Sequence, residues 1–337
     1  MRPSPLALSI GDPAGVGPEI VVKAWQALRN GSPAFLAIGD HESLAAASPS
    51  GASILTRVGS PEEAVKAFPF ALPVLDMPLQ GPVVSGQPSA ANAPMVIRWI
   101  ETAVGLALSG AVCGLVTAPI AKAPLYEAGF RFAGHTEFLD ELTASAPFEG
   151  RRGPVMMLAA GGLRTALVTI HVPYADVPPL ITTERVIRTV EVTAQALNRD
   201  FGIAAPRLVV AGLNPHAGER GAIGREELEV IGPAVSALRA LGYDCRGPLS
   251  ADTLFHPEAR QSYDAAICMY HDQGLIPVKM LDFWGGVNVT LGLPLVRTSP
   301  DHGVGFDIAG RGLARADSLI AAIRMAADIA HHRHRAA

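Results

Sequence analysis

The chain has 337 residues, 49% of them hydrophobic and 17% charged, and its formal net charge is -4. This length and composition predict a globular protein of about two domains, and the weak net charge argues against a nucleic-acid or membrane-surface partner. No apolar run reaches the roughly 18 residues that cross a bilayer, and residues 1–5 lead into an apolar strand without a signal-peptide core. The cysteines (Cys113, Cys245 and Cys268) are isolated and odd in number, which favours reduced thiols in a cytoplasmic protein.

Apolar runs separated by glycine and proline predict alternating strands and helices in the first half of the chain. We expect strands at residues 6–10, 34–39 and 114–119, and helices at residues 18–28, 95–108 and 120–128. The glycine-rich turn at residues 11–19 either binds an anion at the start of the first helix or is a tight turn without a ligand. Lys122 either reaches an anionic ligand or is solvated. Residues 45–90 carry no pattern from which we predict an element.

The second half of the chain continues this alternation. We expect helices after Gly134 and at residues 183–198, 226–241 and 317–330, and strands at residues 155–160, 163–171, 207–213, 266–270 and 287–291. His135 or Thr136 is expected to cap the helix after Gly134. Gly161 and Gly162 predict a hairpin and therefore a mixed sheet. Residues 297–303 are expected to form a loop, and the histidine-rich tail at residues 331–334 is more typical of a frayed terminus than of a metal site.

Three apolar strands run toward a histidine, namely His171, His216 and His271. The last of these strands is expected to stop at a glycine turn, at Gly274. Parallel strands deliver such groups to the carboxyl edge of a sheet. Imidazole is a common ligand of Zn²⁺ and Co²⁺, and three protein ligands with an open position are typical of a catalytic metal site. With Asp252 and Asp272 nearby in sequence, the pattern predicts a metal that polarises a hydroxyl and stabilises the resulting oxyanion, although each histidine alone is also typical of a satisfied polar residue.

Two further groups of residues are candidates for ligand binding. Cationic and polar side chains that suit a phosphate or carboxylate occur at His135, Thr136, Lys279, Asn288 and Arg297; surface charges at Lys279 and Arg297 are the alternative. The glycine-rich segment at residues 301–312 either approaches a flat or phosphorylated ligand or forms a structural hinge. No Ser-His-Asp order or G-x-S-x-G motif indicates acyl transfer.

The motifs resemble those of the 4-hydroxythreonine-4-phosphate dehydrogenase family of pyridoxal phosphate biosynthesis, nearly end to end. They are Gly11-Asp-Pro-Ala-Gly-Val-Gly-Pro, Gly134-His-Thr-Glu-Phe, Gly212-Leu-Asn-Pro-His-Ala-Gly-Glu, Ala251-Asp-Thr-Leu-Phe, Tyr270-His-Asp-Gln-Gly, Gly286-Val-Asn-Val-Thr-Leu-Gly-Leu-Pro and Arg297-Thr-Ser-Pro-Asp-His-Gly. The resemblance implies that His171, His216 and His271 bind one divalent metal (Zn, Co or Mg), in a site shared between the subunits of a homodimer. It also implies that His135, Thr136, Lys279, Asn288 and Arg297 bind the phosphorylated substrate.

A wider resemblance to isopropylmalate and isocitrate dehydrogenases lies in residues 11–19 and 302–312. It implies an α/β fold with mixed sheets, in which two α/β/α domains lie around a cleft. The expected terminal domain comprises residues 1–128 and 300–337, and the central domain, residues 129–299, carries the metal histidines and the dimer interface. The same resemblance assigns the NAD(P) site to His302, Gly303, Asp307 and Gly310, whereas that group binds its metal through aspartates.

These resemblances imply a cytoplasmic, NAD-dependent enzyme that oxidises and decarboxylates 4-phosphooxy-L-threonine to 3-amino-2-oxopropyl phosphate. Lys279, Asp252 and Asp272 are the candidate catalytic residues, with the two aspartates orienting metal-bound histidines. One alternative is a related dehydrogenase acting on a phosphorylated threonate or erythronate, or on a cyclic dihydrodiol. Others are a metal-dependent hydrolase, which leaves residues 301–312 without a role, and a non-catalytic phosphometabolite-binding protein.

Overall fold

A computed structural model describes residues 4–31, 33–132 and 134–336, with no side chain described at residue 336. The first three residues of the expected N-terminal lead lie outside this range. The chain forms two compact units: unit 1 contains residues 1–147 and 293–331, and unit 2 contains residues 148–292 and 332–337. Within the described residues, no helix is long and apolar enough to cross a membrane.

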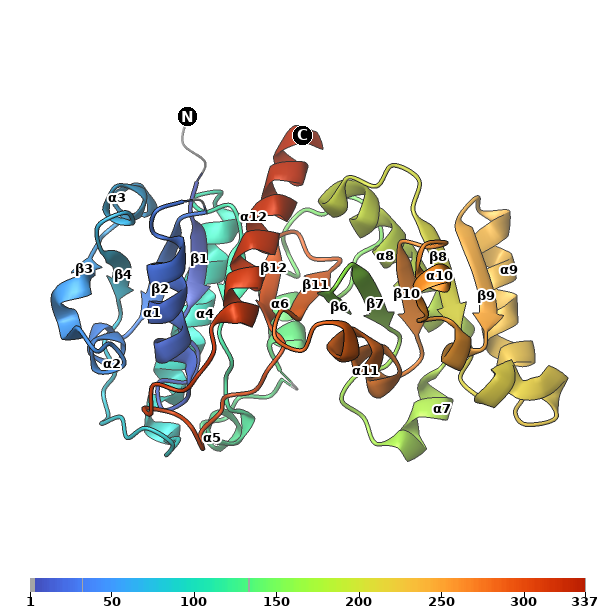
Figure 1. The fold of residues 1–337 in the computed structure, drawn as a ribbon, viewed down its shortest axis with the longest axis horizontal. Coiled ribbons are helices and arrows are strands. Elements are labelled where there is room, and N and C mark those ends of the chain that lie inside the picture. Colours follow the sequence, from blue (N-terminus) through green and yellow to red (C-terminus); the bar gives the residue numbers. More distant parts are fainter. Residues whose placement is uncertain (1–3, 32, 133, 337) are drawn as a thin grey trace. The chain divides into compact units, whose positions relative to one another are not determined.

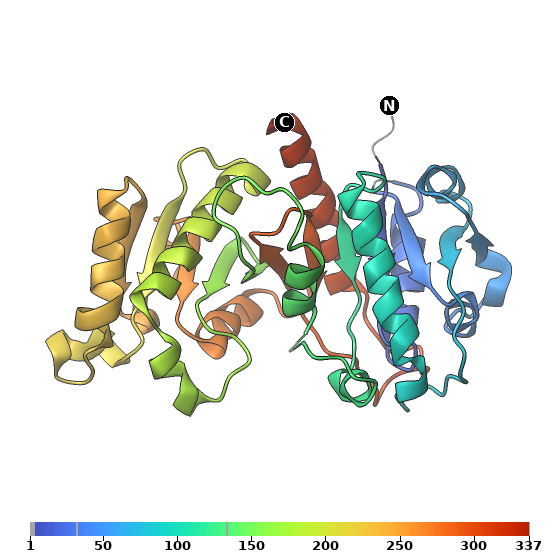
Figure 2. The ribbon, with the colours of Figure 1, turned by 180° about the vertical axis from the view of Figure 1, so that it is seen from behind.

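Unit 1 is a parallel sheet with the strand order β3-β4-β2-β1-β5-β12. Its strands are β1 (Leu6–Ser9), β2 (Phe35–Gly39), β3 (Leu55–Arg57), β4 (Leu72–Asp76), β5 (Leu115–Thr117) and β12 (Arg297–Pro300). The central strands are apolar along their length because helices cover both faces of the sheet. Helices α1 (Gly17–Leu28) and α12 (Asp317–Ala336) lie on one face and α4 (Ala93–Leu108) on the other (Figures 1 and 2).

The remaining elements of unit 1 are short. They are α2 (His41–Ala46), η1 (Gly51–Ile54), α3 (Pro61–Ala67), η2 (Ala90–Asn92), α5 (Lys122–Glu127) and α6 (His135–Leu142). Several of them fall within residues 45–90, where the sequence predicted no element. A signal was present for α3, because Ser60 caps its start by accepting from the Glu63 amide at 3.3 Å and Pro61 follows in the first turn.

Unit 2 has the strand order β11-β6-β7-β10-β8-β9 and is mixed, because β6 pairs antiparallel with both β7 and β11. Its strands are β6 (Val155–Ala160), β7 (Leu163–Leu167), β8 (Arg207–Ala211), β9 (Asp244–Leu249), β10 (Ala265–Cys268) and β11 (Val287–Leu291). The predicted hairpin is confirmed: Gly161 and Gly162 connect β6 and β7 with φ values of 55° and 78°. The mixed sheet expected from this hairpin is therefore confirmed and lies in unit 2.

Two helices cover opposite faces of the unit 2 sheet: α8 (Thr183–Phe201) and α11 (His271–Leu281) (Figures 1 and 2). The smaller helices are η3 (Tyr174–Asp176), α7 (Val177–Leu180), η4 (Pro215–Gly221), η5 (Glu227–Ile231), α9 (Gly232–Ala240), η6 (Ala251–Thr253) and α10 (Pro257–Arg260). The predicted helix at residues 226–241 is thus one turn of π-helix followed by α9.

The observed units differ in their limits from the expected domains of residues 1–128 plus 300–337 and residues 129–299. Residues 129–147 belong to unit 1, where α6 contacts α4. Residues 293–299 also belong to unit 1, because Arg297 and Thr298 begin a strand that pairs with β5. The expected loop at residues 297–303 is therefore wrong in its first half. His171, His216 and His271 all lie in unit 2.

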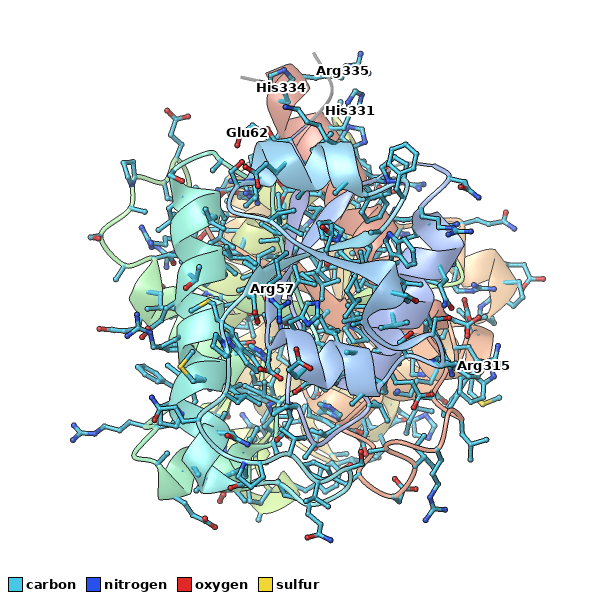
Figure 3. All side chains as sticks on the ribbon, turned by 90° about the vertical axis from the view of Figure 1, so that its left-hand side faces the viewer. Arg57, Glu62, Arg315, His331, His334 and Arg335 are labelled. Carbon is cyan, nitrogen blue, oxygen red and sulfur yellow. The ribbon has the colours of Figure 1, made fainter. Side chains whose placement is uncertain are left out.

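The C-terminal tail is not frayed as the sequence predicted, since α12 continues to Ala336. The Arg333 guanidinium donates to both carboxylate oxygens of Asp200, at 2.8 and 3.0 Å. Asp200 is buried, which raises its pKa, but hydrogen bonds from Arg333 and Arg199 outweigh this and leave the pKa below its usual value. This ion pair orders the last turn of the helix, whereas His334 and Arg335 project away from the fold (Figure 3).

Candidate active site

The carboxyl ends of three adjacent parallel strands carry the predicted histidines. Strand β10 lies between β7 and β8, with Ala266 opposite Thr165 and Ala265 opposite Leu208. The strands end at Leu167, Ala211 and Cys268, earlier than the sequence predicted. Backbone bonds from Val168 and Thr169 to the carbonyls of Cys268 and Met269 continue the alignment beyond β7. His171, His216 and His271 therefore all follow strands that end at one edge of the unit 2 sheet.

His271 begins helix α11, whereas the sequence predicted a turn at Gly274. Gly274 lies inside that helix. The residue at this position is a glycine because a Cβ atom would come within 2.6 Å of the Leu167 side chain. The glycine thus serves close packing of α11 against β7. The helix presents His271 and Asp272 in its first turn.

The buried side chain of Gln273 joins the ends of two strands. Its Oε1 accepts from the Met269 amide at 2.6 Å, and its Nε2 donates to the Gly212 carbonyl at 2.8 Å. Met269 follows β10 and Gly212 follows β8. One amide therefore aligns the segment that carries His216 with the segment that carries His271.

His271 is oriented by a short chain of hydrogen bonds. Its Nδ1 lies 2.7 Å from Oδ1 of Asp272, and the Tyr174 hydroxyl donates to the other oxygen of Asp272 at 2.6 Å. The Tyr174 bond, followed by the His271 contact, lowers the pKa of Asp272. Sequence reasoning missed Tyr174, although its position shortly after His171 was the available signal.

His171 lies beside His271, with the ring centroids 5.5 Å apart. Both histidines line a hollow of about 200 Å³, together with Tyr174, Tyr270 and Asp272. With Nδ1 of His271 engaged by a carboxylate, its Nε2 is the nitrogen suited to a metal, as in many carboxylate-oriented histidine ligands. The donors of this pair fit Zn²⁺ or Co²⁺.

His216 occupies a strained loop. Residues 216–220 (His216, Ala217, Gly218, Glu219 and Arg220) have φ values between 46° and 77°, a left-handed conformation that costs roughly 1–2 kcal/mol for each non-glycine residue. Glu227, which is buried, holds this loop by accepting from the Asn214 amide at 2.7 Å and from its side chain at 2.9 Å. The composition of this loop does not predict its handedness.

Asp252 lies near His216. Its Oδ1 accepts from the Ser250 hydroxyl at 2.6 Å, and this bond, together with the field of His216, lowers the pKa of Asp252. The predicted ligand residues thus form two pairs: His171 with His271, and His216 with Asp252. Within residues 4–31, 33–132 and 134–336, no set of three or more His, Cys, Asp or Glu side chains lies close enough to hold a metal.

The predicted substrate residues are divided between the units, with His135, Thr136 and Arg297 in unit 1 and Lys279 and Asn288 in unit 2. Arg297 is buried and donates to the Thr117 hydroxyl at 2.7 Å. Burial lowers the pKa of Arg297 to about 10, although Glu137 opposes this shift. The alternative reading of Arg297 as a surface charge is excluded.

His135 and Thr136 begin α6, but neither caps it. Gly134 is the N-cap residue, and no side chain caps the helix there. Burial, and then the charges of Arg297 and Lys122, lowers the pKa of His135 well below its usual value. The ring is therefore neutral at pH 7, and its Nε2 is buried without a hydrogen-bond partner in the part of the chain that the structure describes.

In unit 2, Lys279 places its ammonium 5.4 Å from the centre of the Phe283 ring. Asn288 lies in β11 opposite Leu158, and its side-chain oxygen is buried without a partner among the described residues. An amide oxygen in that state is suited to accept a hydrogen bond from a ligand. Both residues therefore remain candidates.

The predicted cofactor residues lie on an exposed loop of unit 1 that is anchored at both ends. Val16 donates its amide to the Val304 carbonyl at 2.9 Å, and Lys23 donates to the carbonyls of Gly312 and Ala314. Among the candidates on this loop, His302, Gly303, Asp307 and Gly310 are all exposed. Gly310 has a φ of 73°, and a Cβ there would come within 2.7 Å of the Ser85 hydroxyl. Glycine is thus required by the backbone and by the close approach of residue 85.

The fold and the site define an α/β enzyme whose reactive groups gather at the carboxyl ends of parallel strands. The family model of "Pyridoxal phosphate biosynthetic protein PdxA" matches residues 32–326. The chain is 68% identical to the 4-hydroxythreonine-4-phosphate dehydrogenase of Caulobacter vibrioides, over 99% of each chain. This chain belongs to the PdxA family of 4-hydroxythreonine-4-phosphate dehydrogenases, which confirms the resemblance predicted from the motifs.

Two solved structures extend the comparison. The 4-hydroxythreonine-4-phosphate dehydrogenase of Klebsiella pneumoniae has a TM-score of 0.85 and 37% identity, covering 97% of this chain and 99% of that one. The terephthalate 1,2-cis-dihydrodiol dehydrogenase of Burkholderia xenovorans LB400 has a TM-score of 0.63 and 31% identity, covering 97% of this chain and 98% of that one. The fold is therefore found in enzymes that are named for different substrates.

Replacing Glu227 with Ala removes the acceptor of the Asn214 backbone amide and one of the two acceptors of the Asn214 side chain, the other being Glu226. We expect the strained loop to loosen. Backbone amides at residues 214–224 should exchange with deuterium about tenfold faster, because each lost bond contributes on the order of 1 kcal/mol. Glu229→Ala is the matched control, since Glu229 is an exposed neighbour that pairs with Arg225. Equal exchange rates in the two variants would show that Glu227 does not hold the loop.

Proposed function

We propose that this chain catalyses the NAD-dependent, metal-assisted oxidation and decarboxylation of 4-phosphooxy-L-threonine to 3-amino-2-oxopropyl phosphate in pyridoxal 5'-phosphate biosynthesis. The observation that carries this proposal is the 68% identity with the Caulobacter enzyme along essentially the whole chain. In the balanced reaction, the secondary alcohol loses a hydride and a proton, and the resulting β-keto acid loses CO₂ and takes up a proton at the carbon that carried the carboxylate.

His171, His216 and His271 are the residues that would hold the divalent ion. When bound, NAD⁺ and the ion supply a hydride acceptor and a Lewis acid, respectively. The orientation of His271 by Asp272 supports this assignment, because a carboxylate on Nδ1 fixes the ring and raises the basicity of Nε2. The carboxylate of Asp252 interacts electrostatically with His216.

Tyr174 and Asp272 act on the reaction through His271. The hydrogen bond from Tyr174 holds Asp272 ionised, and ionised Asp272 selects the tautomer of His271 that carries its proton on Nδ1. Both groups are thus positioning residues. Lys279 is the remaining candidate for proton transfer, since its ammonium is a donor on the same helix as His271.

The anionic groups of the substrate call for cations and donors. Arg297 presents a fork of N–H groups that matches phosphate or carboxylate oxygens, and its burial reduces competition from water. Neutral His135 and Thr136 supply uncharged donors at the start of α6, whereas Lys279 and Asn288 supply an ammonium and an amide in unit 2. These assignments give each of the five predicted residues a binding role.

The exposed loop that contains His302, Gly303, Asp307 and Gly310 is the proposed site of NAD or NADP. Its glycines allow close approach of the backbone to a dinucleotide, and its anchoring by Val16 and Lys23 holds it in place. We infer a cytoplasmic location from the three isolated thiols, Cys113, Cys245 and Cys268.

We also propose that the enzyme is a homodimer formed through unit 2. An apolar patch of α11 and the segment after it is exposed, and consists of Ile276, Met280, Phe283 and Trp284. Patches of this kind mark protein interfaces. Since His171 and His271 on the one hand and His216 on the other form separate groups within one chain, a second subunit offers a way to complete the ligand set.

A second candidate is supported by the likeness to the terephthalate dihydrodiol dehydrogenase. A chain of this fold could oxidise a cyclic dihydrodiol, or a phosphorylated threonate or erythronate. The buried Arg297 favours a substrate with a strongly anionic group. Direct comparison of the substrates decides between these activities.

The proposed reaction is tested by NADH absorbance. Metal-loaded protein with NAD⁺ and 4-phosphooxy-threonine should produce NADH, and His216→Ala should lower kcat/KM by about 100-fold or more because a metal ligand is lost. His256→Ala is the control, since this histidine is exposed and its Nδ1 lies 2.7 Å from a carboxylate oxygen of Glu258, a residue with no proposed role in the reaction. Turnover of a dihydrodiol or of phosphothreonate, with none of 4-phosphooxy-threonine, would replace the proposed substrate.

The proposed dimer is tested by sedimentation. Met280→Glu places a charge within the apolar patch and should convert the dimer into monomers. Phe70→Glu in unit 1 is a matched control, because both side chains are 81% exposed. A wild-type protein that sediments as a monomer, or a Met280→Glu variant that stays dimeric, would contradict the proposed interface.

A further inference from the structure

We propose that Lys122 is a further substrate-binding residue, which holds the phosphate of the substrate together with His135 and Arg297. This inference rests on the proposed function and goes beyond the five residues assigned above. The alternative is that Lys122 is an ordinary solvated lysine. Three observations in unit 1 favour a binding role.

The first observation is the direction of the Lys122 side chain. Gly134 is the N-cap residue of α6, and a Cβ built on it would lie 3.7 Å from Cε and 4.0 Å from Nζ of Lys122. The ammonium therefore lies over the start of α6, next to His135. Lys122 is an exposed residue, so it is the direction of its side chain, and not its burial, that favours a binding role.

The second observation is the local excess of positive charge. Arg297 and Lys122 both act on His135 electrostatically, and after burial their charges are what lower its pKa. Glu137 is the acid whose charge acts on Arg297. One carboxylate facing two cations leaves a net positive charge, and an anionic ligand would offset it.

The third observation is an unused donor or acceptor. The Nε2 atom of His135 is buried and has no hydrogen-bond partner within the described ranges. Buried polar atoms without partners are rare, and a ligand is one common explanation. A phosphate between His135, Arg297 and Lys122 would receive a hydrogen bond from this ring while its charge is balanced by the two cations.

Phosphate fits these groups better than a carboxylate does. A phosphate monoester carries close to two negative charges at pH 7 and three terminal oxygens. Arg297 offers a planar fork, Lys122 a mobile point charge and His135 a neutral donor. A single carboxylate has one charge and two oxygens, so it would leave one of the cations unbalanced.

The test compares Lys122→Gln with Lys122→Arg and with Lys66→Gln, a control lysine on α3 of the same unit. Two readouts are needed: the rise in Tm of the full-length protein on adding inorganic phosphate, and the kinetics with 4-phosphooxy-threonine. For Lys122→Gln we expect the phosphate-dependent rise to disappear and KM to increase about 10- to 100-fold, with a smaller change in kcat. Lys122→Arg should retain part of both, and Lys66→Gln should match the wild type.

The outcomes separate this inference from the proposed function. If the phosphate-dependent rise in Tm and the KM are both unchanged in Lys122→Gln, the proposed role of Lys122 is overturned, and the proposed substrate is not affected. A loss of kcat at constant KM and constant phosphate stabilisation would also overturn it, since binding would be unaffected. Wild-type protein that is stabilised by phosphate through Lys122, yet does not turn over 4-phosphooxy-threonine, would support the phosphate site and contradict the substrate. Stabilisation by acetate in place of phosphate would overturn the choice of phosphate.

Discussion

The buried amide of Gln273 is the contact on which the arrangement of the unit 2 site depends. By bonding to the Met269 amide and the Gly212 carbonyl, it fixes the exits of β10 and β8 relative to each other. His271 and His216 both lie on the segments that leave these strands. Leaving the buried donors of this amide unpaired would cost about 1–3 kcal/mol. This cost favours the arrangement in which both hydrogen bonds are made. The ends of these strands thus determine the positions of His216 and His271 along the edge of the sheet.

Strain and packing at this edge are concentrated where the chemistry is expected. The left-handed backbone conformation around His216 is energetically unfavourable. The hydrogen bonds from Asn214 to Glu227 offset part of this free-energy cost. Within α11, Gly274 allows the helix to approach β7 closely, and His271 at the start of the same helix lies beside His171. Unit 1 contributes a different set of groups, in which the buried Arg297, the exposed Lys122 and the neutral His135 are the proposed ligands of an anion. The two units therefore divide the proposed tasks of metal binding and phosphate binding.

Much of this organisation was predictable from the sequence, because apolar runs that lead to His171, His216 and His271 identify the strands and the polar residues that follow them. The hairpin at Gly161 and Gly162 was predictable for the same local reason. Other features depend on contacts between distant residues. Gln273 gains its role only when Gly212 comes near, and Gly274 looked like a turn because its packing against Leu167 is not visible in the sequence. Ala217, Glu219 and Arg220 disfavour a left-handed turn, so no composition rule would have placed one there.

The central claim is that the strand ends of unit 2 form the metal site, and anomalous diffraction tests it most directly. Crystals grown with Zn²⁺ would be measured at the zinc absorption edge. The account predicts one strong peak per chain, about 2.0–2.1 Å from nitrogen atoms of His171 and His271, with His216 from one of the subunits completing the set. A strong peak at the histidine-rich tail of α12, with none beside His171 and His271, would contradict it.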